Sequence, residues 1–201
     1  MARNLGAPLP VAPPAPGILA SAATGAAGFI GSLGGDVDRI FGNARIAPDM
    51  AGSPTLRLRL PDFCRLFEEA AQQTRYGNLG LRFGNQFQPR DLGFWGYAAI
   101  SSPTVGLALA SLVDLLGLHQ ESTHMSLVRG GDGLMRLSYQ IEAPDIIERR
   151  QDAELSLGMF LNVIRESCGS SWAPEEVHFE HPKPVDAEEH RAAFGAPVYF
   201  S

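Results

Sequence analysis

Apolar residues recur at helical spacing in two long stretches of the chain. The stretch LPDFCRLFEEAAQQT, residues 60–74, predicts an amphipathic helix. The stretch RRQDAELSLGMFLNVIRES predicts a longer helix, which Gly169 ends. The positions expected to face inward on these two helices are Phe63, Leu66, Phe67, Ala70, Leu155, Met159, Phe160 and Val163.

Shorter helices are predicted around these two. Residues 18–33 are small and apolar and predict a helix despite their glycines, and Asp36 is a suitable N-cap for the next helix. Residues 78–84 predict another short helix. In RDLGFWGYAAISSPTVGLALASLVDLLGLHQ, Pro103 separates two helices. Both are apolar over most of their surface, so we expect them to lie centrally.

The pattern changes to strict alternation further along the chain. HMSLVRGGDGLMRLSYQIEAP holds two alternating runs around GGDG, which predicts a β-hairpin with a bulge near Met135. Val177 and Phe179 share one face of a strand in EEVHFEHP, DAEEHRAAFG predicts a short helix, and APVYFS begins a last strand. Helices followed by β-β-α-β-α-β predict an α+β fold with an antiparallel sheet that carries helices on one face.

Composition and charge narrow the classes of function. The chain has 201 residues, of which 45% are hydrophobic, enough for one domain with a sizeable core. A net charge of -6 disfavours nucleic-acid binding by these residues themselves, and the single lysine is Lys183. Cys64 and Cys168 lie in apolar segments without metal-binding spacing. We therefore expect two buried thiols in a reducing compartment.

The N-terminal segment differs in composition from the rest. Residues 1–17 are rich in proline and alanine and predict a flexible leader, with the folded domain over residues 18–201. Proline disrupts the apolar helix of a signal peptide, and no apolar run is long enough to span a bilayer. We expect a cytoplasmic protein that makes no contact with a membrane.

The stretch ATGAAGFIGSLGG raises the question of a dinucleotide site. Its TGAAGFIG resembles, letter for letter, the glycine motif of extended short-chain dehydrogenases. That motif follows a buried strand, and those enzymes place a lysine one helical turn after a catalytic tyrosine. Here PPAPGILASA precedes the glycines, and no tyrosine has a lysine at that offset. A closely packed helix is the favoured interpretation, and an NAD-dependent enzyme is the less favoured alternative.

The histidines and carboxylates form no metal-binding or catalytic motif. His178 and His181 fall on opposite faces of the predicted strand. What remains are aromatic side chains, several with polar tips, which suit the lining of a small-ligand pocket as well as an ordinary core. The candidate ligand-binding residues are Phe94, Trp95, Tyr97, His119, Tyr139, Phe160 and Trp172. We expect no cofactor, no metal ion and no catalytic residue.

Several segments together resemble a known family. DLGFWGYAAISSPTVGLAL is similar to the central signature of the N-terminal, arabinose-binding-type sensor domain of AraC-family transcriptional regulators. GGDVDRIFGNARIAPDM, FCRLFEEAAQQT, RRQDAELSLGMF and WAPEEVHFEHPKPVDAEEHRAAFGAPVYF are similar to other parts of that domain in the same order. The resemblance spans roughly residues 28–201, and it places Gly28 and Gly31 in the family's first helix, without a cofactor role.

The resemblance implies an effector-sensing and dimerisation domain. Members of the family carry a C-terminal pair of helix-turn-helix motifs that binds DNA, and this sequence ends at Ser201 before such a module. We therefore expect a sensor domain that binds a small-molecule effector, forms a homodimer and contacts DNA only through that missing module. A standalone ligand-binding or protein-interaction domain is the alternative.

Overall fold

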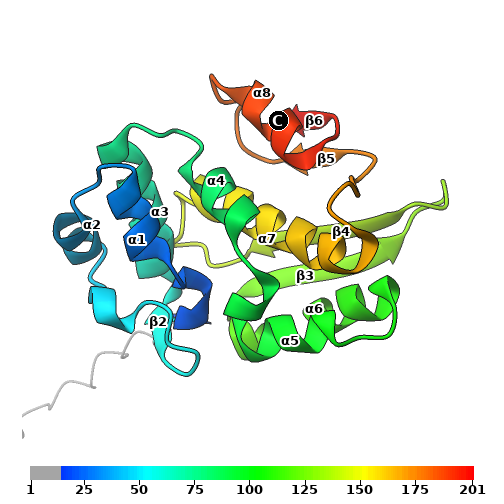
Figure 1. Ribbon diagram of the computed structural model, residues 1–201, viewed down its shortest axis with the longest axis horizontal. Coiled ribbons are helices and arrows are strands. Elements are labelled where there is room, and N and C mark those ends of the chain that lie inside the picture. The colour runs from blue at the N-terminus through cyan, green and yellow to red at the C-terminus, as the bar shows by residue number, and fades with distance from the viewer. Residues whose placement is uncertain (1–14) are drawn as a thin grey trace, which may run out of the picture.

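A computed structural model of the protein describes residues 15–201. The leader was predicted for residues 1–17, and its residues 1–14 lie outside the described residues. Helices predominate, and a long helix, α7 (Arg150–Cys168), runs through the middle of the molecule (Figure 1). The other α-helices are α1 (Ala26–Ser32), α2 (Val37–Asn43), α3 (Leu60–Thr74), α4 (Leu79–Gln86), α5 (Phe94–Ile100), α6 (Val105–His119) and α8 (Ala187–Phe194). Short 3-10 turns are η1 (Ala20–Ala23), η2 (Pro48–Met50) and η3 (Pro89–Leu92).

The strands pair in twos rather than in one sheet. Their bounds are β1 (Gly17–Leu19), β2 (Arg57–Arg59), β3 (Thr123–Arg129), β4 (Met135–Ile141), β5 (Val177–Phe179) and β6 (Val198–Phe200). β1 pairs with β2 and β3 with β4, both antiparallel, while β5 pairs with β6 in parallel. The α+β class is confirmed, and the order β3, β4, α7, β5, α8, β6 is as predicted. β1 and β2 were not predicted, and the strands form three separate pairs, one of them parallel, rather than one antiparallel sheet.

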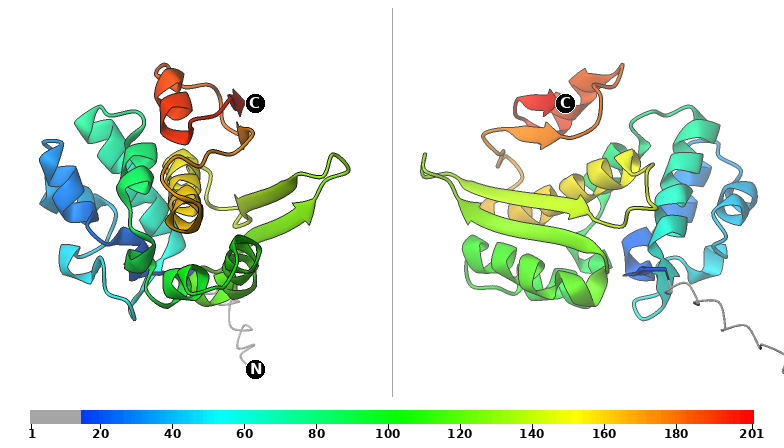
Figure 2. Two further views of the ribbon diagram at one scale, coloured as in Figure 1. Left: turned by 45° about the vertical axis from the view of Figure 1, so that its right-hand side comes forward. Right: turned by 180° about the vertical axis from the view of Figure 1, so that it is seen from behind.

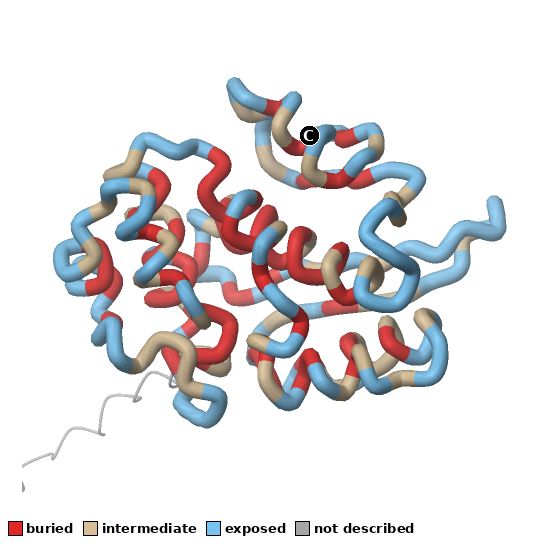
Figure 3. The backbone as a smooth tube through the Cα atoms, viewed as in Figure 1, coloured by how far each residue is buried: buried red, intermediate tan, exposed pale blue. Residues whose placement is uncertain are grey.

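Three parts surround α7. Helices α1–α3 form one side, α5 and α6 lie along the hairpin β3–β4, and β5, α8 and β6 form a C-terminal unit (Figures 1 and 2). Buried residues concentrate along α3, α4 and α7, whereas the outer end of the hairpin is exposed (Figure 3). A main core joins α3, α7 and the hairpin, and a second, smaller core lies between α7 and the C-terminal unit.

The two long helices form as the apolar spacing predicted. The inward positions named for α3 and α7 are all buried. Asp36 caps α2 by accepting a hydrogen bond from the Arg39 backbone N–H at 3.1 Å. These helices form because one continuous apolar stripe on each can be removed from water.

Several predictions were wrong in detail. Residues 18–33 do not form one helix, because β1 pairs with β2 before a 3-10 turn and α1 follow. The hairpin has a regular register from Thr123–Ile141 to Arg129–Met135 and no bulge. Cys64 is buried, but Cys168 is exposed because the last turn of α7 projects beyond the core.

Helices α5 and α6 are less central than their composition predicted. Leu107 and Leu118 of α6 are 52% and 58% exposed, and only the opposite side of the helix enters the core. A helix that is apolar all round carries no sequence signal for which side faces inward.

Candidate functional site

A closed cavity lies where α7 meets the hairpin, α3, α5 and the end of α6. Its free volume is about 10 Å³, close to the room that one water molecule requires. The residues around it are Ile18, Ala22, Phe63, Trp95, His119, Gln120, Tyr139, Asp152, Leu155, Ser156, Met159 and Phe160. Five of these come from α7, so this helix supplies the largest part of the lining.

Aromatic rings form the walls of the cavity. Trp95 stacks on His119 with 4.3 Å between ring centroids, and its indole N–H donates to the Leu112 backbone oxygen at 3.0 Å. Phe160 meets the rings of both Trp95 and Tyr139 edge-on. These contacts hold the rings in fixed orientations around the free space.

A chain of hydrogen bonds crosses the floor of the cavity. The Gln120 side-chain amide donates to the Tyr139 hydroxyl at 2.7 Å, and that hydroxyl donates to Asp152 Oδ2 at 3.0 Å. Burial, with a smaller contribution from the nearby charge of Glu68, raises the pKa of Asp152 to about 7. Burial also lowers the pKa of His119 to about 3, so this ring is neutral at neutral pH.

Two atoms of this lining have no hydrogen-bond partner. Asp152 Oδ1 and His119 Nδ1 are both buried and unpaired in the described part of the chain. An unsatisfied buried polar atom costs about 1–3 kcal/mol. The cavity therefore retains unused hydrogen-bonding capacity.

The structure brings four of the seven candidate residues together and separates the other three. Trp95, His119, Tyr139 and Phe160 line the cavity. Phe94 and Tyr97 are on the outer side of α5, 65% and 53% exposed. Trp172 follows α7 and packs against the second core. These three side chains do not line this cavity.

Asp152 was missed by the sequence analysis although a signal was present. It lies on the same helical stripe as Leu155, Met159 and Phe160, so it is a carboxylate within an otherwise apolar face. The sequence gives no such signal for Gln120, because its place at the cavity depends on a long-range β-bridge to Ile18 of β1.

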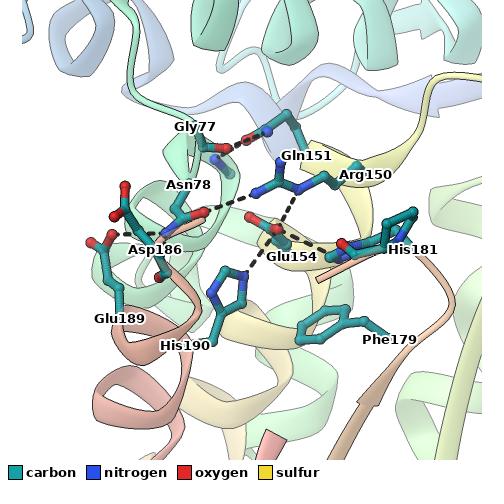
Figure 4. A network of polar contacts seen from close by, with 12 residues as sticks. Gly77, Asn78, Arg150, Gln151, Glu154, Phe179, His181, Asp186, Glu189 and His190 are labelled. Carbon is teal, nitrogen blue, oxygen red and sulfur yellow. Dashed lines mark hydrogen bonds and ion pairs between the residues drawn. The ribbon is translucent and has the colours of Figure 1, made fainter. Parts of the chain in front are cut away.

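A buried polar network lies on another side of α7. Glu154 is 0% exposed, and its carboxylate accepts from Arg150 Nε at 2.8 Å. His190 Nε2 of α8 and His181 Nε2 after β5 lie 3.0 Å and 3.4 Å from Glu154 Oε1, without hydrogen-bond geometry (Figure 4). Arg150 also donates to Asn78 at 2.8 Å. The network joins α4 and α7 to the C-terminal unit.

The histidine prediction is refined by this network. His178 is exposed on β5, but the strand ends at Phe179, so His181 lies beyond it and turns toward Glu154 instead of occupying the opposite strand face. No group of three or more histidine, cysteine or acidic side chains suited to a metal ion occurs among residues 15–201.

A wider hollow follows the loop after β4. It has a volume of about 570 Å³ and is lined by residues 140–144, Ile146, Ile147 and Arg149. It is open to solvent, and none of its side-chain polar atoms is both buried and unpaired. The closed cavity is therefore the stronger candidate for a specific site.

Fold and cavity together define a domain in which one helix separates a closed aromatic cavity from a C-terminal unit. Residues 34–201 match the family described as the N-terminal arabinose-binding domain of AraC transcription regulators. The chain belongs to this family, which comprises sensor domains of transcription regulators and is not a class of enzymes.

A curated relative agrees with this assignment. The chain is 27% identical over 164 residues to the ornithine utilization regulator of Pseudomonas aeruginosa, a match that covers 80% of this chain. The match covers 47% of that relative, so the chain spans about half its length. Within residues 15–201, no helix combines the length and apolar character needed to span a membrane.

Proposed function

We propose that the chain is the effector-binding and dimerisation domain of an AraC-type bacterial transcriptional regulator, with the closed cavity as its effector site. The observation that carries this proposal is the pair of buried, unpartnered atoms, Asp152 Oδ1 and His119 Nδ1, in an aromatic-lined cavity. A ligand that pairs with them recovers the free energy that their isolation costs.

Binding requires the cavity to enlarge. A free volume of about 10 Å³ excludes an organic effector, so the closed structure corresponds to the ligand-free state. Met159 is an adaptable part of the lining, because its unbranched side chain changes shape easily. The effector then stabilises an open arrangement that the free domain populates weakly.

Helix α7 connects the cavity to the C-terminal unit. One side of it carries Asp152, and another carries Glu154, which faces His181 and His190. A displacement of α7 on binding therefore changes the surface against which β5, α8 and β6 pack. In the full-length regulator we infer that this unit leads to a DNA-binding helix-turn-helix module, whose placement it controls.

A homodimer is supported by exposed apolar side chains on α5 and α6. Leu107 and Leu118 lie eleven residues apart and so on one side of α6, and both are more than half exposed. Phe94 and Tyr97 are exposed one helical turn apart on α5. Large apolar side chains that remain exposed on neighbouring helices are candidates for an interaction surface.

The proposed role places the protein in the cytoplasm, where bacterial DNA is located, and assigns it no catalysis. A standalone ligand-binding or interaction domain remains the second candidate. It is supported by the same cavity and exposed helices, and it requires no DNA-binding module. An effector-dependent change in DNA binding by a longer protein distinguishes the first from the second.

The proposal is tested by a thermal-shift screen of the chain against small metabolites, including ornithine, to which the name of the Pseudomonas relative refers. A true effector at 100 times its Kd stabilises the domain by about 2.7 kcal/mol. Ser156→Leu fills the cavity and is expected to abolish the shift. Ser32→Leu, at an exposed position of α1, is the matched control and retains it. Absence of hits, or hits that stabilise the Ser156→Leu variant equally, contradicts the proposal.

A further inference from the structure

The buried carboxylates of the described chain differ in their partners. Asp62 has Arg59 and Arg65 within 3.4 Å, and Glu154 has Arg150 at 2.8 Å. Asp152, the remaining buried acidic side chain of residues 15–201, has no ion pair. Buried charges are normally paired, so Asp152 lacks a cation that its two counterparts have.

Neighbouring charges do not supply that cation. Arg149 lies near Asp152, but its guanidinium donates to the Ile141 backbone oxygen at 2.6 Å instead. Glu68 is the other nearby charge and is of the same sign as Asp152. The lining of the cavity contains no arginine and no lysine. A bound anion would therefore meet a carboxylate in a lining that contains no positively charged side chain.

Few hydrogen-bond donors of the cavity lining are free to bind a ligand. Its strongest donors are already used, since the Trp95 N–H, the Gln120 amide and the Tyr139 hydroxyl all have acceptors within the protein. The free oxygen is Asp152 Oδ1, which accepts when ionised. A ligand that pairs with the ionised Asp152 must bring a donor, whereas His119 Nδ1 accepts or donates according to its tautomer.

Resting on the proposed function, we propose that the cavity selects a small organic cation, an amine that is protonated at neutral pH. Its ammonium group donates to Asp152 Oδ1, and its apolar part packs against Trp95 and Phe160. Because the His119 ring is neutral, it does not repel the cation.

Matched probes that differ only in their head group test this inference. The first set is benzylamine, benzyl alcohol and benzoate, and the second is propylamine, propanol and propionate, so that two sizes are covered. Binding is followed by the fluorescence of Trp95 in the Trp172→Phe chain, because Trp95 lines the cavity and Trp172 does not. Thermal shift of the same samples gives an independent readout.

We expect the amines to bind about 10- to 100-fold more tightly than the matched alcohols, as for a hydrogen bond to a charged group, and the carboxylates not to bind. Asp152→Asn removes this preference and brings amine and alcohol to similar Kd values. Asp62→Asn, at the other aspartate that is buried, retains the preference.

Each other outcome overturns the inference in a recognisable way. Equal or tighter binding of an alcohol or carboxylate, reported by Trp95, refutes the cation class but supports the cavity as a binding site. An unchanged amine preference in Asp152→Asn refutes the role of Asp152. If no probe of either size binds, the cation class is wrong, and the metabolite screen decides separately whether the cavity binds effectors.

Discussion

Asp152 and His119 are perturbed in opposite directions by the same cause. Burial disfavours the charged form of each side chain, which raises the pKa of the aspartate to about 7 and lowers that of the histidine to about 3. The folded state thus binds a proton at Asp152 more tightly than the unfolded chain does, and at His119 less tightly. Asp152 lowers stability as pH rises from about 4 to about 7, and His119 lowers it as pH falls from about 6.5 toward 3.

Replacing Asp152 with a neutral residue is expected to stabilise the domain by an amount that increases with pH. Asp152→Asn is expected to melt only slightly above the wild type at pH 4 and clearly higher at pH 8, since asparagine never becomes charged. Thermal unfolding at the two pH values measures this difference. Asp114→Asn, at an exposed position of α6, is the control and should change little at either pH. A difference for Asp152→Asn that does not grow with pH would show that the carboxylate is not desolvated.

At the residue scale, the sequence shows which side chains are suited to line a pocket better than it shows which of them face inward. Of the seven candidate ligand-binding residues, four meet at one cavity, namely Trp95, His119, Tyr139 and Phe160, and the other three lie elsewhere. Phe94 and Trp95 are adjacent in sequence and point to opposite environments, which no periodicity in an all-apolar helix distinguishes.

At the scale of elements, α4 and α7 form the most extensive helix contact, and glycines make it possible. A Cβ atom on Gly80 or Gly84 of α4 would overlap the carbonyl oxygens of Gln151 and Leu155 on α7. A Cβ atom on Gly158 of α7 would also come too close, at 2.8 Å from the Gly84 backbone. The two backbones therefore touch directly, which fixes the position of the helix that lines the cavity.

Gly84→Ala is predicted to destabilise the domain by about 1–3 kcal/mol, because the added methyl group forces the helices apart. Gly117→Ala on α6 is the matched control, since nothing lies within 4 Å of its added Cβ. That substitution should stabilise the helix by about 0.5–1 kcal/mol. Chemical denaturation measures both. Equal stability of Gly84→Ala and the wild type would mean that the crossing is looser than the structure shows.

The sequence predicts which elements form better than it predicts how they pair. Helices α3 and α7 and the hairpin have strong local patterns and are found where expected. The pairing of β1 with β2 and the parallel pairing of β5 with β6 join segments that are distant in sequence. Three-residue strands carry too little alternation to specify such partners.

At the scale of the whole molecule, α7 takes part in two separate regions, the cavity and the contact with the C-terminal unit. It contributes Asp152, Met159 and Phe160 to the cavity, and Glu154 and Leu161 to the contact with the C-terminal unit. Because packed helices move as rigid bodies, a ligand that displaces one side of α7 changes the other. The domain is thereby suited to convert occupancy of a cavity into a change at its C-terminal end.

Hydrogen exchange of the chain with and without an effector from the screen tests whether α7 couples the cavity to the C-terminal unit. On binding, we expect slower exchange in α7 and in the C-terminal unit of residues 177–200, in addition to the elements that line the cavity. The Ser156→Leu variant, whose cavity is filled, should show no change with the same compound. Protection confined to segments away from the cavity, or protection of the cavity with none in residues 177–200, would contradict this coupling.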